Sequence, residues 1–174
     1  MRKIILAILL ATVGLTGCSG YLDVKPYDQI AEDELLQSEQ GYEKLLNGIY
    51  IELNSDALYG KSLTTEMIEV MGQVWQGGDN EETWGHYIDL WNHRYGTAYW
   101  RQRLDHTWDK AYALIANCNK IIDHIDGQKA LFGGNHYDMV KGEALALRAY
   151  LHFDMLRLFG PVYIRNPKGR GIPY

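Results

Sequence analysis

The chain of 174 residues has little cysteine and no basic run beyond its first few residues. Its two cysteines, Cys18 and Cys118, stand far apart in unrelated surroundings, so they do not suggest a disulfide framework. The net charge is −5 at neutral pH. A nucleic acid is therefore not expected as a partner, because its phosphates need a positively charged surface.

Motifs of the common enzyme classes are also missing. The six histidines show no HExxH or other zinc spacing, and no G-x-S-x-G, P-loop or G-x-G-x-x-G occurs. His86 and His93 with Asp89 between them leave a small metal site open as an alternative. Three carboxylate pairs have the form of a glycosidase acid and nucleophile, although on helices such pairs normally face solvent: Glu66/Glu69, Glu81/Glu82 and Asp105/Asp109. We expect no catalytic residues, no metal and no cofactor, and a secreted glycan-processing enzyme remains a third hypothesis.

Aromatic residues are plentiful and unusually distributed. Thirteen tyrosines and five tryptophans stand against three phenylalanines, and hydrophobic residues make up 47% of the chain. That content is enough for one domain with a sizeable core. Tyr and Trp combine a flat apolar face with a polar edge, which suits binding surfaces as well as cores.

The N-terminal residues MRKIILAILLATVGLTGC have the order of an export signal. Arg2 and Lys3 form a basic region, residues 4–15 form an apolar region of secretory length, and residues 15–18 (LTGC) resemble a bacterial lipobox. We predict a lipoprotein signal peptide at residues 1–17 and lipidation of Cys18. The residue after the cysteine, Ser19, favours sorting to the outer membrane, where several acyl chains hold a protein more firmly than one. An ordinary signal peptide with an incidental cysteine, or a buried strand, is the alternative.

The remaining chain is predicted to be all-α. Residues 18–33 are expected to form an extended, lipidated tether, and residues 34–174 a helical domain. A helix with Ser38 as its N-cap is indicated by a stripe at helical spacing: Tyr42, Leu45, Leu46, Ile49, Tyr50 and Leu53. A shorter helix is expected at residues 63–74 and a long one at 99–126, with Trp108 and Tyr112 in the core. Cys118, lacking an evident base, is expected to be a small core residue rather than a nucleophile.

The stretch at residues 142–160, GEALALRAYLHFDMLRLFG, is apolar around nearly the whole helical circumference. We therefore predict a central helix that is buried on several sides, and it is too short and too charged to span a bilayer. Gly160 is expected to take a positive φ and Pro161 to block continuation. Glu143, Asp154 and Arg157 are interpreted as an internal charge network rather than a ligand site. With residues 99–126 this helix forms an αα-hairpin of tetratricopeptide-like spacing.

Residues 76–96 are predicted to be a long, irregular, aromatic-rich loop with one helical turn, and long loops in compact domains are often functional. Carbohydrate sites pair flat aromatic side chains with hydrogen-bonding groups, and this region supplies both. The predicted ligand-binding residues, led by the first two, are Trp84, Trp91, Trp75, Tyr87, Asp89 and Asn92. The alternative is that several of these side chains simply fill the core beneath the loop.

Three segments together resemble the SusD/RagB family of outer-membrane nutrient-binding lipoproteins. The first is the lipobox followed directly by an LD-x-K-P run, at residues 18–26 (CSGYLDVKP). The second is W-x3-Y-x2-I-x3-N at residues 108–119, and the third and most specific is EALALRAYLHFDMLRLFG at residues 143–160. The resemblance covers essentially the whole mature chain, but only the N-terminal part of the family's longer members. This partial coverage, together with an end at Tyr174 in an expected loop, suggests that the sequence is a fragment of a longer protein.

The resemblance implies tetratricopeptide-like helical hairpins and a protein without catalytic activity. It also implies capture of an oligosaccharide, or another nutrient, for a SusC-like TonB-dependent transporter at the cell surface, and no cofactor follows from it in general. A lipid-anchored helical scaffold that binds a protein partner but no small ligand remains the alternative hypothesis.

Overall fold

The computed structural model describes residues 35–75 and 84–174, so the predicted signal peptide, Cys18 and the tether lie outside the described residues. Every regular element in the described part is a helix, which confirms the predicted all-α class. The elements are α3 (Glu39–Leu53), α4 (Met67–Met71), α6 (Tyr87–Trp91), α7 (Ala98–Ile125), the 3-10 helix η2 (Asp126–Leu131) and α8 (His136–Phe159). None of these described helices is long and apolar enough to cross a membrane.

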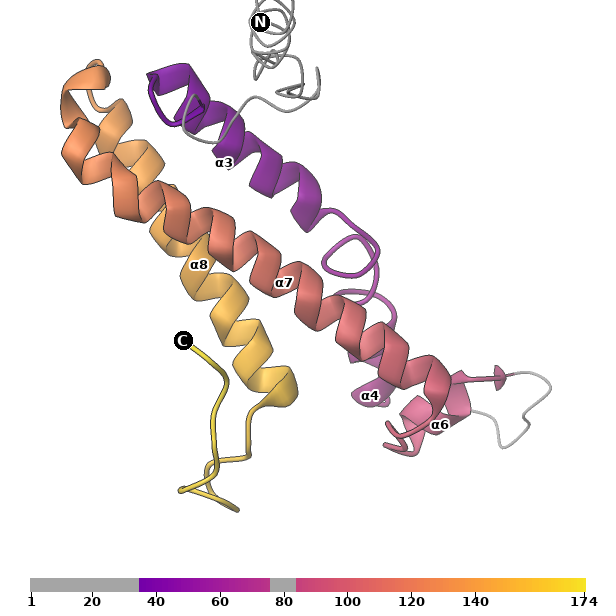
Figure 1. Cartoon of the computed structure of the whole chain (residues 1–174). Helices are drawn as coiled ribbons and strands as arrows, with labels where there is room; N and C mark the ends of the chain where they lie inside the picture. The colour runs from indigo at the N-terminus through magenta and orange to yellow at the C-terminus, as the bar shows by residue number, and fades with distance from the viewer. Residues whose placement is uncertain (1–34, 76–83) are drawn as a thin grey trace, which may run out of the picture. The chain divides into compact units, whose positions relative to one another are not determined.

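The two longest helices, α7 and α8, lie side by side as the predicted hairpin (Figure 1). η2 and a glycine turn join them, and Gly134 in that turn adopts a φ of 56°, which glycine does without steric cost. α8 begins at His136, six residues before the apolar stretch at residues 142–160. The helix tolerates this interior glycine because Val140, one half-turn earlier, already packs in the core and extends the buried face.

α3 packs against both helices of the hairpin and completes the main core. Its N-cap is Ser38, as predicted: the Ser38 hydroxyl accepts a hydrogen bond from the Gly41 N–H at 3.2 Å. Capping satisfies one of the backbone donors that a helix N-terminus leaves free. Tyr42, Leu46 and Ile49 carry the buried face, and Cys118 of α7 lies fully buried beneath them in the same core.

A second apolar cluster lies at the N-terminal end of α7, where α4 and α6 gather (Figure 1). Its buried members are Met67, Val70, Leu90 and Trp100. α4 is shorter than the predicted helix over residues 63–74, because the residues before it form hydrogen-bonded turns instead. The Leu63 N–H, for example, donates to the Leu58 carbonyl at 2.8 Å.

The predicted burial of the 142–160 helix on several sides is wrong. One face of α8 is buried against α3 and α7 through Val140, Ala144, Leu147, Leu151 and Met155. The opposite face carries an exposed apolar stripe, which includes Leu145, Phe153 (56% exposed) and Leu156 (46% exposed). Within the described residues, neighbouring helices cover only one side of α8, and its all-round apolar composition does not reveal this.

The predicted positive φ at Gly160 is also wrong, because this residue has φ −76° and ψ 158°. The glycine serves a close approach instead. A Cβ atom added at Gly160 would lie 2.5 Å from the Leu156 carbonyl oxygen, so any other residue would have to shift the end of the helix.

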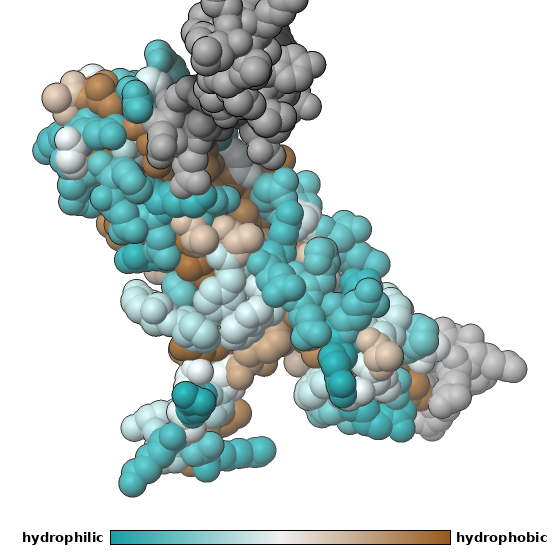
Figure 2. Space-filling view, viewed as in Figure 1, coloured by the Kyte–Doolittle hydropathy of each residue, from teal (hydrophilic) through white to brown (hydrophobic). Residues whose placement is uncertain are grey.

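The residues after α8 return to the hairpin. The Tyr112 hydroxyl donates to the Pro173 carbonyl at 2.8 Å, and the Tyr174 ring packs on His152 with 4.6 Å between ring centroids. The face drawn in Figure 2 is mostly hydrophilic, with hydrophobic residues visible in scattered areas between the helices.

Candidate functional site

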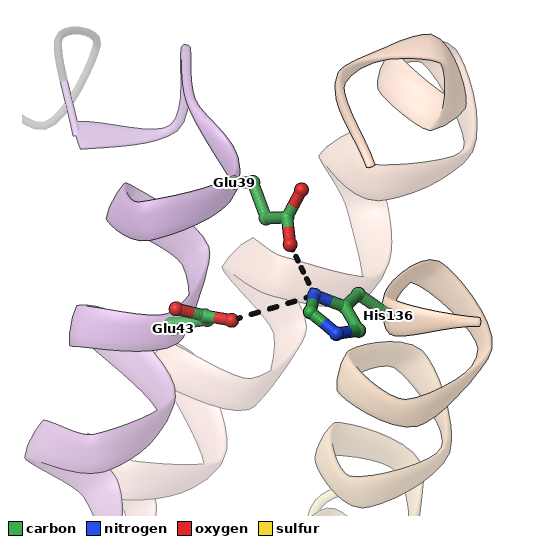
Figure 3. A group of neighbouring side chains, drawn as sticks. All are labelled: Glu39, Glu43 and His136. Carbon is green, nitrogen blue, oxygen red and sulfur yellow. Dashed lines mark hydrogen bonds and ion pairs between the residues drawn. The ribbon is translucent and has the colours of Figure 1, made fainter. Parts of the chain in front are cut away.

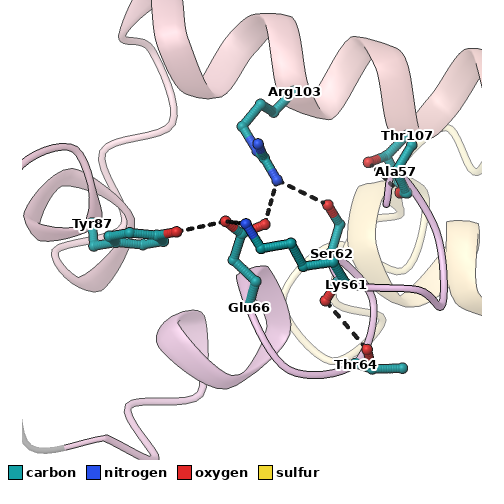
Figure 4. Close-up of polar contacts among 8 residues, drawn as sticks. All are labelled: Ala57, Lys61, Ser62, Thr64, Glu66, Tyr87, Arg103 and Thr107. Carbon is teal, nitrogen blue, oxygen red and sulfur yellow. Dashed lines mark hydrogen bonds and ion pairs between the residues drawn. The ribbon is translucent and has the colours of Figure 1, made fainter. Parts of the chain in front are cut away.

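A buried carboxylate, Glu66, ties together the segments around the N-terminal end of α7 (Figure 4). Its Oε1 atom accepts a hydrogen bond from the Tyr87 hydroxyl at 2.6 Å and pairs with Lys61 Nζ at 3.0 Å. Its Oε2 atom pairs with Arg103 of α7, which also donates to the Ser62 hydroxyl at 3.2 Å. One carboxylate therefore links α6, α7 and the turn that precedes α4.

The interpretation of Glu66 and Glu69 as a solvated pair is wrong for Glu66, whose side chain is only 5% exposed. Burial by itself would raise the pKa of Glu66, but the hydrogen bonds from Tyr87 and Lys61 and the charge of Arg103 together lower it. Burial and the contact with Glu66 raise the pKa of Tyr87 to about 12. Glu66 is thus held as an anion and is unsuited to act as a general acid near neutral pH.

An aromatic pocket of about 300 Å³ opens beside this network. Its lining consists of Lys61, Thr65, Glu66, Val70, Trp75, Trp84 and Tyr87. The pocket therefore brings together three of the six predicted ligand-binding residues, namely Trp75, Trp84 and Tyr87. Trp75 is 53% exposed, so about half of this side chain is open to solvent, while Glu66 and Lys61 add charged hydrogen-bonding groups to the lining.

The other three predicted residues do not line the aromatic pocket. Trp91 packs against Trp84, with ring centroids 6.0 Å apart. Asp89 forms a salt bridge with Arg94 at 2.7 Å. The Asn92 side chain, at the C-cap of α6, donates to the Ile88 carbonyl at 2.8 Å.

The alternative metal site at His86, Asp89 and His93 does not assemble. His86 stacks on Tyr99 with 4.2 Å between ring centroids, and His93 bonds to the Tyr95 hydroxyl at 2.8 Å. In the described part of the chain, the group of side chains with metal-binding geometry is a different one: Glu39, Glu43 and His136.

The polar residues of α8 form the predicted internal network only in part. Asp154 is buried, accepts a hydrogen bond from the Tyr59 hydroxyl at 2.7 Å and pairs with Arg157 one turn later. Burial and the contact with Asp154 raise the pKa of Tyr59. Glu143 lies elsewhere on α8, where it accepts a hydrogen bond from the Tyr50 hydroxyl at 2.9 Å.

A larger hollow of about 870 Å³ lies along α7, with Arg103 in its lining. Its lining includes Asp105 and Asp109, which are exposed as predicted. No Trp, Tyr or Phe side chain lines this hollow among the described residues. Four lining residues of the aromatic pocket are absent from the predicted set: Lys61, Thr65, Glu66 and Val70. The one usable signal in the sequence is that they lie close before Trp75, in and just ahead of the short helix α4, which ends at Met71.

Comparison with known proteins gives consistent matches. Residues 20–173 match the SusD-like family described as "Starch-binding associating with outer membrane". SusD-like protein P2 of Formosa agariphila is 24% identical over 165 residues, which are 93% of this chain and 31% of that protein. SusD-like protein P25 of the same organism is 23% identical over 146 residues, which are 82% of this chain and 27% of that protein. No solved structure matches the chain.

The chain thus spans about a third of the length of the curated relatives it matches. The family match, by contrast, runs through nearly all of the present sequence, including α7, α8 and the aromatic pocket. The chain therefore belongs to the SusD-like family, whose description is starch-binding and associating with the outer membrane.

Proposed function

We propose that this chain is the N-terminal part of a nutrient-binding lipoprotein of the outer membrane, exposed at the cell surface, that binds an oligosaccharide. It passes this ligand to a SusC-like TonB-dependent transporter and has no catalytic activity. The observation that supports this function best is the aromatic pocket, which places Trp75, Trp84 and Tyr87 beside fixed charged groups.

The chemistry of the aromatic pocket suits a sugar. Sugar rings have apolar C–H faces that pack on indole rings, and their hydroxyls need charged or polar partners. The exposed part of the Trp75 side chain supplies an apolar surface for the sugar ring, and Lys61 and Thr65 supply polar partners for its hydroxyls. A volume of about 300 Å³ is at the lower end of the range for small-molecule sites, roughly 300–1,000 Å³, so we expect contact with one end or one face of a longer chain.

The same surroundings argue against hydrolysis. Glycosidases use two carboxyl groups on either side of the scissile bond, one of which has a raised pKa. Glu66 is the single carboxylate among the described residues that line the aromatic pocket, and its pKa is lowered. The pair Glu81 and Glu82 lies outside the described residues.

Oligosaccharide binding is tested by calorimetric titration of the full chain, purified in detergent, with starch-derived oligosaccharides and a wider glycan panel. We expect Trp75→Ala and Trp84→Ala each to weaken binding at least ~10-fold, since each removes a stacking surface worth about 1.5 kcal/mol or more. Tyr95→Ala is the matched control, because Tyr95 belongs to the same aromatic-rich segment but does not line the pocket.

Unchanged affinity in both Trp variants would place the ligand elsewhere on the chain. Absence of binding to every glycan, with a transporter still co-purifying, would favour the alternative of a lipid-anchored interaction scaffold. The exposed apolar stripe of α8, at Leu145, Phe153 and Leu156, is the observation that favours this alternative, because such surfaces often mark protein contacts.

The lipid anchor is tested separately by Cys18→Ala. We expect this variant to leave the membrane fraction, since the cysteine carries the acyl chains that hold the protein. A Cys18→Ala protein that still sediments with outer membranes after a high-salt wash would disprove lipidation as the means of anchoring, without bearing on the aromatic pocket.

A further inference from the structure

Three side chains from two distant parts of the sequence converge where α3 and α8 begin (Figure 3). Glu39 and Glu43 lie one turn apart on α3, and His136 is the first residue of α8. The His136 Nδ1 atom contacts Glu39 Oε1 and lies 3.8 Å from Glu43 Oε1. One ligand atom from each of the three residues lies within 4.8 Å of the other two, so small side-chain rotations bring all three around one ion.

The geometry of this cluster is supported from outside. The second oxygen of Glu39, Oε2, accepts a hydrogen bond from the Gly133 N–H at 3.0 Å. This bond leaves Oε1 directed at His136 and fixes the carboxylate between the α7–α8 connection and α3. Carboxylates and imidazoles that bind metals are commonly oriented by such outer hydrogen bonds. The Gly133 N–H, together with His136, also lowers the pKa of Glu39.

A hollow of about 240 Å³ opens beside the cluster, lined by Glu43, Leu46, Asn47, His136, Met139, Val140 and Glu143. Glu43 and His136 are 45% and 49% exposed, so an ion can reach the cluster from solvent. The hollow has room for water molecules in the coordination positions that the protein leaves open. Glu143, the third acidic residue at this place, adds to the negative potential there.

The ligand chemistry selects among cations. Two carboxylate oxygens and one imidazole nitrogen match the three-ligand sets of open zinc sites. Calcium and magnesium prefer oxygen ligands throughout and gain little from an imidazole nitrogen. Glu39 and Glu43 both approach the Nδ1 atom of His136, so the three side chains offer two carboxylates and one imidazole at a single place.

We propose that Glu39, Glu43 and His136 form a binding site for a divalent transition metal of the zinc type, with open positions filled by water. The bound ion joins the start of α3 to the start of α8 and stabilises the three-helix core. The site lies at the opposite end of the helical layer from α4 and α6 (Figure 1), so it is independent of the aromatic pocket and of the proposed ligand.

The test is calorimetric titration of the metal-free full chain with ZnCl2 in a buffer that does not bind zinc. We expect one ion per chain at this site, and an affinity loss of at least ~10-fold in Glu43→Gln and in His136→Gln, because each removes one of three ligands. His124→Gln and Glu52→Gln are matched controls, since both residues are exposed and lie outside the cluster. Far-UV circular dichroism of the metal-free variants checks that they fold.

A second measurement is thermal unfolding with and without zinc. A ligand that binds only the folded state raises the Tm, here by about 5 °C at saturating metal, and we expect this rise to disappear in His136→Gln. Equal zinc affinity and an equal rise in Tm in wild type and both cluster variants would overturn the proposal. So would tighter binding of Ca²⁺ than of Zn²⁺, because that would remove the role of the imidazole.

Discussion

At the scale of single residues, Cys118 shows how burial sets reactivity. It lies fully buried on the inner face of α7, and burial raises the pKa of its thiol to about 11. The thiolate is the nucleophilic form of cysteine. Cys118 is therefore a packing residue in the folded chain, as its place in a helix without a neighbouring base predicts.

The first prediction concerns the reaction of Cys118 with a thiol reagent at pH 8, in a chain with Cys18→Ser so that one thiol remains. Against an ordinary pKa of 9.0, we expect labelling in the folded chain to be at least ~100-fold slower than in the urea-unfolded chain. Because the pKa of Cys118 is higher in the folded chain than in the unfolded chain, the free energy of unfolding does not depend on this thiol below pH 9. It falls as the pH rises from 9 toward 11, where the unfolded chain loses the thiol proton first. Equally fast labelling in both states would contradict the burial of Cys118.

The second prediction concerns Glu66→Gln. This change leaves Arg103 and Lys61 without their anionic partner, and we expect the free energy of unfolding at pH 7 to fall by about 2 kcal/mol. The value is below that for a fully buried pair because solvent screens the partly exposed cations. Chemical unfolding measures the change, and Glu52→Gln, on an exposed surface pair with Lys110, should cost at most ~0.5 kcal/mol.

The pH dependence of this difference provides a further check. The pKa of Glu66 is lowered from an ordinary value of 4.5, so its stabilising contribution is present above that pH. It is lost as the pH falls through the lower pKa of the folded state. The difference in the free energy of unfolding between wild type and Glu66→Gln should therefore become smaller below pH 4.5. A difference that increased on acidification would contradict the ion network.

At the scale of elements, α8 has two apolar faces with different surroundings. The third prediction compares Leu151→Ala on the buried face with Phe153→Ala on the exposed stripe. We expect Leu151→Ala to lower the free energy of unfolding by about 3 kcal/mol, because it leaves a cavity. Phe153→Ala should cost less than ~1 kcal/mol, since that ring loses little beyond its contact with Arg157 at 5.0 Å.

Urea unfolding at low protein concentration measures both variants. If Phe153→Ala lowered the free energy of unfolding as much as Leu151→Ala, the exposed stripe would be covered in solution. Light scattering would then show whether a second chain covers it. Equal costs without self-association would place another part of the same chain on this face.

Helix positions were largely predictable from the sequence, whereas their surroundings were not. The stripe from Tyr42 to Leu53 has the period of a helix with one buried side, and α3 forms there with the predicted N-cap, Ser38. In α8 the apolar residues run around the whole circumference, so periodicity cannot distinguish the face toward α7 from the open one. α4 is short because side chains and turns around Glu66, rather than local propensity, decide the backbone there.

The aromatic residues of the candidate site could be predicted from the sequence, but its charged residues could not. Trp75, Trp84 and Tyr87 stand out by composition and converge at one pocket. Glu66 did not stand out, because its partner Arg103 is 37 residues away and a carboxylate near a helix start normally faces solvent. Likewise, His136 reaches Glu39 across 97 residues, a separation that no local pattern encodes.

At the scale of the whole molecule, two apolar clusters share the length of α7. The larger cluster joins α3, α7 and α8, and the smaller one gathers α4 and α6 at the beginning of α7. Leu63 packs against both clusters, so the segment that carries the aromatic pocket is coupled to the main core. Changes at the pocket's base therefore affect stability as well as binding, and surface changes at Trp75 are the cleaner probe of ligand contact.

The α7–α8 hairpin also has a consequence for the order in which the chain folds. Its two helices are joined by residues 126–135 only, whereas residues 54–97 separate α3 from α7. Closing the longer connection costs about 1 kcal/mol more chain entropy, and contacts that are close in sequence form sooner. We expect the hairpin to be the folding nucleus and α3 to dock after the rate-limiting step.

The fourth prediction tests this order by stopped-flow kinetics. Leu147→Ala in the hairpin interface should mainly slow folding, with a φ-value above ~0.5, and Leu46→Ala in α3 should mainly speed unfolding, with a φ-value below ~0.3. Reversed values would place the nucleus at α3. With the expected values, α3 detaches from the core before the unfolding transition state is reached, while the α7–α8 hairpin is still largely formed.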